Sequence, residues 1–135
     1  MVARITTGSG VGGAARYNDA KLIKSEAALL GIVNYPYARP ELLTSTQRID
    51  VLEVLSEQNN RVKETAVHVV LSFHPSEELS DFQLLRIAGD YMKELGYEDQ
   101  PQLVYRHDDR PHPHIHIVTT RVEEGGKVIS NSNNL

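Results

Sequence analysis

The chain has 135 residues, enough for one domain with a hydrophobic core of its own. It contains no cysteine, which excludes disulfides and thiolate metal sites, and it has no apolar run of the length that a signal peptide or a membrane span requires. Its formal net charge of −4 argues against a protein that coats nucleic acid non-specifically, although residues 1–48 carry an excess of cations. These features favour a cytoplasmic protein without a membrane segment.

The chain begins with a predicted strand, a glycine-rich loop and a helix, at residues 2–7, 8–13 and 14–28. The loop, GSGVGG, matches the Gly-x-Gly-x-x-Gly pattern of dinucleotide-binding proteins. However, the next apolar run ends in Asn34 where that motif needs an acidic residue, and Ala14 stands where a Walker loop needs lysine. We therefore interpret the loop as a mobile connection rather than a nucleotide site. Tyr17, early in the helix, is by itself typical of a packing or surface residue.

Two further helices are predicted by their capping patterns. Thr44-x-x-Gln47 and Ser80-x-x-Gln83 are capping boxes, in which the side chain of each residue bonds the backbone N–H of the other. Apolar residues then recur at helical spacing, to about residue 58 in the first helix and to just before Gly96 in the second. These helices are scaffold, because they carry no pattern of catalytic residues.

Residues 66–73 form the clearest predicted strand. Alternate side chains of a strand point to opposite faces, so one face is apolar while the other carries His68, Val70 and Ser72. A lone histidine in such a strand is more often hydrogen-bonded within the fold than a metal ligand. We interpret His68 in that way from its position.

The histidines are concentrated in residues 105–121, YRHDDRPHPHIHIVTTR, which hold four of the six in the chain. From His112 onward histidine recurs at every second position, so three imidazoles share one face of a strand while the neighbouring isoleucines face a core. Imidazoles on an open face, with His107 and Asp109 just upstream, form a nitrogen-rich ligand set for a divalent metal. Hydrogen-bonded or solvated histidines on an edge strand are the alternative interpretation.

The remaining elements predict the fold. Strands are expected at residues 103–107, 114–122 and 127–129, with a tight turn at residues 123–126. Late strands with short connections favour antiparallel pairing, so the predicted class is α+β: one two-layer domain over residues 1–135, with a mostly antiparallel sheet and helices on one face. The polar side chains of the strands place the active site on the other face.

Three segments occur in an order that is more specific than any single pattern. They are HVVLSFHPSEELS from His68, YMKELGYEDQPQLVYRHDD from Tyr91, and HIHIVTTRV from His114. Together they resemble the relaxase/mobilisation nuclease family, within the histidine-hydrophobe-histidine endonuclease superfamily. The opening, VARITTGSG followed by ARYNDAKL, resembles mobilisation proteins of Bacteroides-type elements. Family members continue with further helices beyond the position that matches Leu135, so a C-terminal truncation relative to the family is expected.

The resemblance implies site- and strand-specific nicking and rejoining of DNA at a transfer origin. According to this resemblance, Tyr17 attacks the scissile phosphate and stays joined to the 5′ end of the cut strand as a phosphotyrosyl intermediate. Ser72 is implied to lie near the DNA backbone or the tyrosine, and Asp109 to orient an imidazole or to accept the tyrosine proton. A covalent phosphodiester link conserves the bond energy, so rejoining needs no nucleotide cofactor.

His107, His114 and His116 are the metal ligands that the resemblance implies, with His112 as an alternative to His107. The implied cofactor is a divalent metal, Mg²⁺ or Mn²⁺ by analogy with the family, although imidazoles also suit Zn²⁺ or Ni²⁺. Three neutral ligands leave open positions for phosphate oxygens, as a catalytic site requires. An ion there polarises the phosphoryl group and offsets charge in the transition state.

The implied partners are single-stranded or supercoiled DNA at a transfer origin, accessory mobilisation proteins and a coupling protein, in the movement of a plasmid or an integrative element. Three other functions remain as alternatives. A rolling-circle replication initiator uses the same parts, a metal-dependent hydrolase or oxygenase uses the histidines without Tyr17, and a binding module recognises the origin without cutting it.

Overall fold

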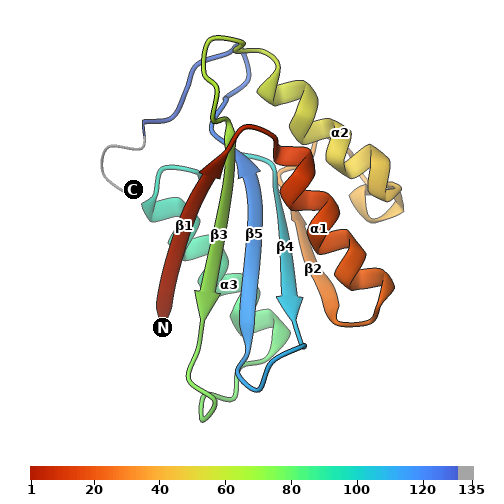
Figure 1. Cartoon of the computed structure of the whole chain (residues 1–135), viewed down its shortest axis with the longest axis vertical. Helices are drawn as coiled ribbons and strands as arrows, with labels where there is room; N and C mark the ends of the chain where they lie inside the picture. The colour runs from red at the N-terminus through yellow and green to blue at the C-terminus, as the bar shows by residue number, and fades with distance from the viewer. Residues whose placement is uncertain (131–135) are drawn as a thin grey trace.

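The structure is a computed structural model, and it describes residues 1–130. Its elements in chain order are β1 (Val2–Gly8), α1 (Val11–Ile23), β2 (Ala27–Val33), η1 (Pro40–Leu42), α2 (Ser45–Ser56), β3 (Ala66–Ser72), α3 (Asp81–Glu94), β4 (Gln102–His107) and β5 (His114–Thr120). The five strands form one open sheet in the order β1-β3-β5-β4-β2, and every neighbouring pair is antiparallel (Figure 1). The predicted α+β class is therefore confirmed.

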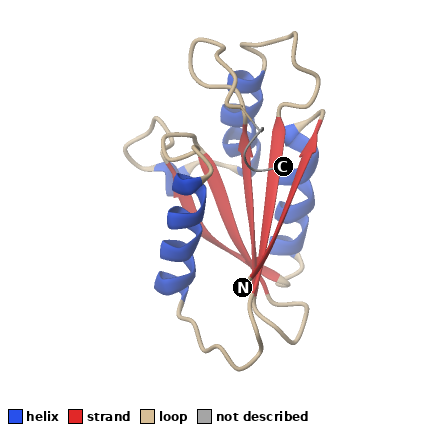
Figure 2. Cartoon of the chain, turned by 90° about the vertical axis from the view of Figure 1, so that its left-hand side faces the viewer, coloured by secondary structure: helices blue, strands red, loops and turns tan. Residues whose placement is uncertain are grey.

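One face of the sheet is covered by α3 and holds a hydrophobic core (Figure 2). Ile115 and Ile117 of the central strand β5 point into this core and are fully buried. The helix contributes Leu84, Ala88 and Met92, which recur every four residues and so form one stripe. This packing confirms that the isoleucines next to the histidines face a core.

The opposite face is only partly covered, by α1 and α2 over its β4 and β2 side (Figure 1). Ala15 of α1 and Leu52 of α2 form a second core there with Leu103, Tyr105 and Val118 of the strands. Helices were expected on one face alone. They occupy both because the histidine face is itself half apolar, and those strand side chains need cover. The β1 and β3 side of this face stays open.

The predicted helix over residues 14–28 differs from α1 at both ends. It begins earlier, at Val11, with three residues of the glycine-rich loop, Val11, Gly12 and Gly13, in its first turn. It ends earlier, at Ile23, because Ser25 adopts a left-handed backbone with φ of 59° and Ala27 already belongs to β2. The apolar run that ends in Asn34 therefore forms an edge strand.

The strand predicted at residues 127–129 is wrong. Within the part of the chain that the structure describes, this segment contributes only a single antiparallel bridge, between Val122 and Val128. Gly125 and Gly126, with φ of 93° and 95°, turn the chain there in a conformation that other residues rarely adopt.

The two predicted capping boxes are confirmed. The Thr44 side chain accepts from the Gln47 backbone N–H at the start of α2, and Ser80 does the same with Gln83 at the start of α3. None of the helices within residues 1–130 has both the length and the apolar character needed to cross a membrane.

Candidate metal centre

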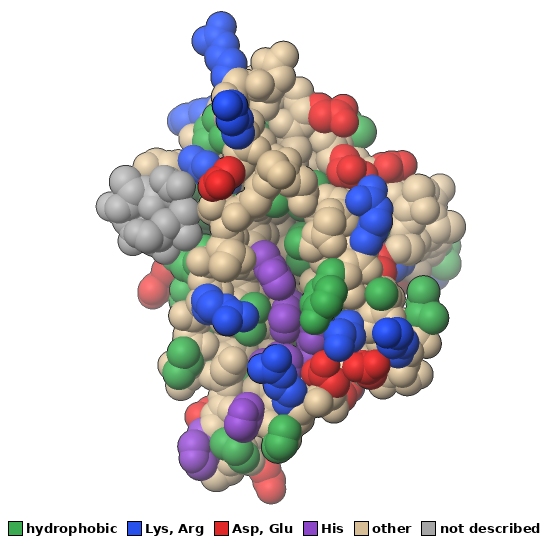
Figure 3. All heavy atoms as spheres, viewed as in Figure 1, with side chains coloured by type: hydrophobic (Ala, Val, Ile, Leu, Met, Phe, Trp, Pro, Cys, Tyr) green, Lys and Arg blue, Asp and Glu red, His purple; other side chains and the backbone are tan. Residues whose placement is uncertain are grey.

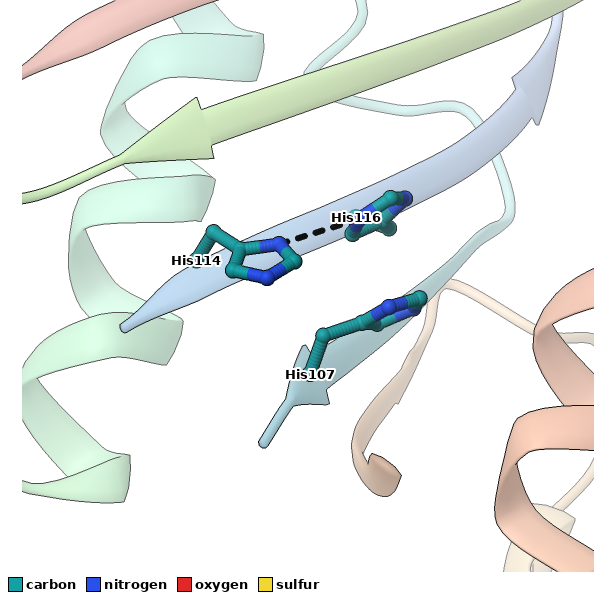
Figure 4. A group of neighbouring side chains, drawn as sticks. All are labelled: His107, His114 and His116. Atoms are coloured by element: carbon teal, nitrogen blue, oxygen red, sulfur yellow. Dashed lines mark hydrogen bonds between the residues drawn. The ribbon is translucent and has the colours of Figure 1, made fainter. Parts of the chain in front are cut away.

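Histidine side chains gather in the half-open face of the sheet, with cationic groups on both sides of them (Figure 3). His107 ends β4 and is the antiparallel partner of His114 at the start of β5, and His116 follows on the same face (Figure 4). All three are buried, and one nitrogen from each lies within 4.8 Å of the others. His112 is exposed and lies outside this cluster.

The donor atoms of the cluster fit a divalent metal ion. His114 Nδ1 and His116 Nε2 are 3.2 Å apart, which is close to the separation of two nitrogen ligands that each lie about 2.1 Å from one ion. His114 Nε2 is buried without a hydrogen-bond partner among the described residues, since Asp109 Oδ1 lies 3.6 Å away. This nitrogen is not the one that faces His116, so it points toward Asp109, while Nδ1 belongs to the donor pair.

Two outer contacts leave defined ring nitrogens free. His68 Nε2 lies 2.8 Å from His116 Nδ1, and Asn18 Oδ1 lies 2.6 Å from His107 Nε2. The Asn18 oxygen only accepts hydrogen bonds, so His107 Nε2 donates and its Nδ1 keeps a lone pair. The contact with His68 likewise occupies His116 Nδ1 and leaves Nε2 for an ion. Such outer partners fix the tautomer and the orientation of ligating imidazoles.

Burial keeps these imidazoles neutral. Burial, with a smaller contribution from the neighbouring imidazoles, lowers the pKa of His116 to about 2 and the pKa of His107 to about 4. Burial also lowers the pKa of His114 and of His68. Because neutral imidazole is the form that coordinates a metal, the site presents nitrogen lone pairs rather than positive charge.

We expect the metal-free chain to lose stability as the pH falls below about 6.5, the ordinary pKa of histidine. Unfolded histidines take up protons there, whereas folded His107 and His116 do so only near pH 4 and pH 2. The unfolded state therefore binds more protons in this range, and each such group costs at most about 1.4 kcal/mol per pH unit. Urea unfolding at pH 7, 6 and 5 after chelator treatment measures the loss. The variant His112→Ala, which removes an exposed histidine, should show the same dependence of the unfolding free energy on pH. A urea midpoint that does not change with pH would contradict the expectation.

The cluster opens into a pocket of about 390 Å³ that the other predicted site residues also line. Tyr17 reaches it from α1, Ser72 from the end of β3, and Asp109 from the loop after β4. Ser72 is also the antiparallel partner of His114. The fold thus brings a tyrosine from the start of the chain to the same space as histidines from its end.

Tyr17 is 55% exposed, and Lys21 Nζ lies 5.7 Å from the centre of its ring. Lys21 Nζ also binds Asp109 at 2.9 Å and Glu26 at 3.2 Å. The hydrogen bond from Lys21 lowers the pKa of Asp109, which is therefore a carboxylate at neutral pH. Lys21 connects the helix that carries the tyrosine to the loop that borders the histidines.

Asp19, two residues after Tyr17, anchors α1 to the rest of the fold. Its Oδ1 accepts a hydrogen bond of 2.8 Å from the Tyr105 hydroxyl, and its Oδ2 accepts one from the Ser45 hydroxyl. The guanidinium of Arg48 lies 3.5 Å from the same carboxylate. These partners belong to β4 and α2, so they hold the helix in a fixed position relative to the histidine strands.

Replacing Asp19 with alanine should lower the free energy of unfolding by about 3 kcal/mol, because Arg48 and the Tyr105 hydroxyl lose their buried acceptor. Urea unfolding followed by circular dichroism measures the change. Asp50→Ala, at an exposed position of α2, is the matched control and should change stability by less than about 0.5 kcal/mol. Equal stabilities of the two variants would show that α1 is not held through this carboxylate.

A larger hollow, of about 500 Å³, lies at the other end of the sheet, beside α2 and the residues that follow β2. Tyr37, Val54 and Asp99 line it, but none of its described lining residues is a histidine or a predicted site residue. The convergent nitrogen donors of the histidines, and not the volume of the cavity, therefore identify the candidate site.

Sequence reasoning missed Asn18, Asp19 and Lys21 as contributors to the site, and it gave His68 a structural role only. Asn18 and Asp19 had a detectable signal in the sequence. They fall on the buried stripe of α1, between Ala15 and the half-buried Leu22. Polar residues at buried helix positions need partners. His68 had no signal beyond sharing a strand face with Ser72.

An α+β domain whose open sheet face carries three convergent, neutral imidazoles defines a candidate metalloenzyme with an accessible site. A family model described as "Relaxase: MobA/VirD2-like, nuclease domain" matches residues 38–135, and the chain belongs to this family. The resemblance to the relaxase/mobilisation nuclease family is thus confirmed.

A curated relative supports the same family. "Protein MobA" of Acidithiobacillus ferrooxidans is 34% identical over 80 residues, which are 58% of this chain and 20% of that protein. The matched part therefore spans a fifth of the relative. The family match begins at residue 38, so it includes the three histidines, Ser72 and Asp109 but not Tyr17.

Proposed function

We propose that this chain nicks one DNA strand at a transfer origin by transesterification, with Tyr17 as the nucleophile. The Tyr17 oxygen forms a bond to the scissile phosphorus, the bond from phosphorus to the 3′ oxygen breaks, and the leaving 3′ oxygen takes up a proton as the phenol loses one. The 5′ end stays on the tyrosine, and attack by a 3′ hydroxyl reverses the step. The observation that supports this proposal is that Tyr17 and the histidines line one pocket.

His107, His114 and His116 would hold the metal ion, Mg²⁺ or Mn²⁺ by analogy, or Zn²⁺ or Ni²⁺ by their chemistry. When bound, the ion supplies polarisation of the phosphoryl oxygens. His68 and Asn18 hold two of these imidazoles in the required tautomer.

The polar residues around the cluster have distinct proposed roles. The Ser72 hydroxyl, half-exposed beside His114, can donate to a phosphate oxygen. Asp109 lies 3.6 Å from His114 and is bound to Lys21, so it orients the loop and that imidazole. It is also the carboxylate in the pocket that can accept the phenol proton.

The proposal extends to the setting of the reaction. The substrate is single-stranded DNA, or supercoiled DNA opened locally at the origin, because a nucleophile on a helix needs an unpaired strand within reach. Accessory mobilisation proteins and a coupling protein are the proposed partners, and the cytoplasm is the proposed location.

The test is to incubate the chain with Mn²⁺ and overlapping single-stranded oligonucleotides that cover the transfer origin of its own element. A product with the mass of protein plus the 3′-side fragment, mapped to Tyr17 by peptide sequencing, is the expected result. Cleavage without any covalent product would favour a hydrolase. Binding without cleavage would favour a module that only recognises the origin.

A further inference from the structure

We propose that Arg4 of β1 binds the backbone phosphate immediately 5′ of the scissile phosphate, and so forms a subsite for the strand that leaves with a free 3′ hydroxyl. This subsite rests on the proposed nicking function, which it extends from the scissile phosphate to the path of the DNA.

The sheet register places Arg4 on the histidine face, two strands away from the cluster. Arg4 pairs with Val70 on β3, and Val70 pairs with His116 on β5, so the three residues form one row across the sheet. Neighbouring strands are about 4.8 Å apart, which puts the Arg4 and His116 backbones about 10 Å apart. The Arg4 side chain lines the same pocket as His116, with only the small Val70 side chain between them.

The charge of Arg4 is available for a ligand. Among residues 1–130, no carboxylate forms an ion pair with it. The positions of β1 and β3 that share its face carry no acidic residue. Lys21, on the other side of the histidines, is by contrast bound to two carboxylates.

Arg4 and Tyr17 lie on opposite sides of the histidines. Tyr17 is carried by α1, which is anchored to β4, whereas Arg4 lies on the edge strand β1. In a phosphoryl transfer, the attacking and leaving oxygens are roughly in line through the phosphorus. If the phenol attacks from the α1 side, the 3′ oxygen must leave toward β1. The nucleotides 5′ of the nick therefore pass over Arg4.

A guanidinium suits this task, because its fork of donors binds two phosphate oxygens at once. Arg110 is the other cation of the pocket without an ion pair among the described residues. It follows Asp109 in the β4–β5 loop, at the ends of the strands, and not across the cluster from the tyrosine. The in-line argument therefore selects Arg4.

The experiment uses the oligonucleotide that the wild-type chain cleaves, and measures binding by fluorescence anisotropy in the Tyr17→Phe background. Adding Arg4→Ala should weaken binding about tenfold, and should lower the slope of log affinity against log salt by about 0.7, the value of one phosphate contact on a single strand. Arg86→Ala, at an exposed position of α3, removes the same charge from the other face and should leave both quantities unchanged.

Neutral methylphosphonates then identify the phosphate. One placed 5′ of the scissile position should weaken binding by the same factor as Arg4→Ala and should have no further effect in that variant. One placed 3′ should weaken binding equally with and without Arg4. Arg4→Gln repeats the comparison should the alanine variant fail to fold.

The outcomes separate the two proposals. No covalent adduct with the wild-type chain overturns the nicking function and the subsite together. The subsite alone is overturned if the adduct forms but Arg4→Ala and Arg86→Ala change DNA binding equally. It is also overturned if the adduct forms but the effect of Arg4→Ala depends on the phosphate 3′ of the scissile position.

Discussion

Tyr17→Phe is expected to abolish the covalent DNA adduct and to lower nicking by a factor on the order of 10⁴ or more. Phenylalanine keeps the ring that stands 5.7 Å from Lys21 Nζ, so the helix and the pocket should be preserved. What is lost is the oxygen of the proposed nucleophile. Denaturing gel electrophoresis of radiolabelled oligonucleotide measures both the adduct and the free 3′ product.

The control for this variant is Tyr37→Phe, which removes the same atom from a tyrosine that is 52% exposed in the hollow at the other end of the sheet. It should nick like the wild type. Metal affinity, measured by isothermal titration calorimetry, should be unchanged in both variants. Full adduct formation by Tyr17→Phe would identify another nucleophile, and unchanged cleavage without an adduct would favour the hydrolase alternative.

His116→Ala is the second change for which a large effect is expected, a fall in nicking on the order of 10³-fold. His116 makes the closest contacts in the cluster: its ring stacks on His107 with centroids 3.6 Å apart, and its Nε2 lies 3.2 Å from His114 Nδ1. Its Nδ1 also contacts His68 outside the cluster. Its removal takes away one of three nitrogen donors and the contact that holds His68. Titration with Mn²⁺ should show affinity reduced by at least about a hundredfold.

Two substitutions at His68 calibrate this result. His68→Phe removes the partner of His116 Nδ1 and should lower metal affinity by roughly ten- to a hundredfold. His68→Gln offers an amide oxygen to the same nitrogen and should restore most of the loss. His112→Ala, at the exposed histidine beside the cluster, should leave affinity unchanged. A loss in His112→Ala as large as in His116→Ala would mean that the ligand set is not the one in Figure 4.

The parts of the fold that were predictable are those set by local rules. The capping boxes at Thr44 and Ser80 fixed where two helices begin, and strict alternation fixed which face of β5 carries the histidines. The first helix was predicted to run on to residue 28 because Ala27 and Ala28 suit a helix as well as a strand, and only pairing with β4 decides between them. Likewise, which sheet face a helix covers depends on packing that no local pattern contains.

Some residues of the candidate site were predictable from their spacing in the sequence, and others were not. The histidine cluster follows from spacing, because one antiparallel pair brings His107 opposite His114. The place of Tyr17 does not follow from spacing; it came from the family resemblance alone. The contacts of Asn18 and His68 with the ligands join residues far apart in the chain. Such contacts depend on the register of the whole sheet, which local sequence does not specify.

The strand that supplies two of the histidines is the middle one of five, paired along its length on both sides. Its amides should exchange with solvent only when the whole domain opens. Tyr17, in contrast, sits on a helix that packs on the sheet from outside. Local detachment of that helix would withdraw the proposed nucleophile together with Asn18, the partner of His107, while the paired strands kept His114 and His116 in place. On the proposed function, cutting would then stop while the sheet stayed folded, and it would resume when the helix docks again.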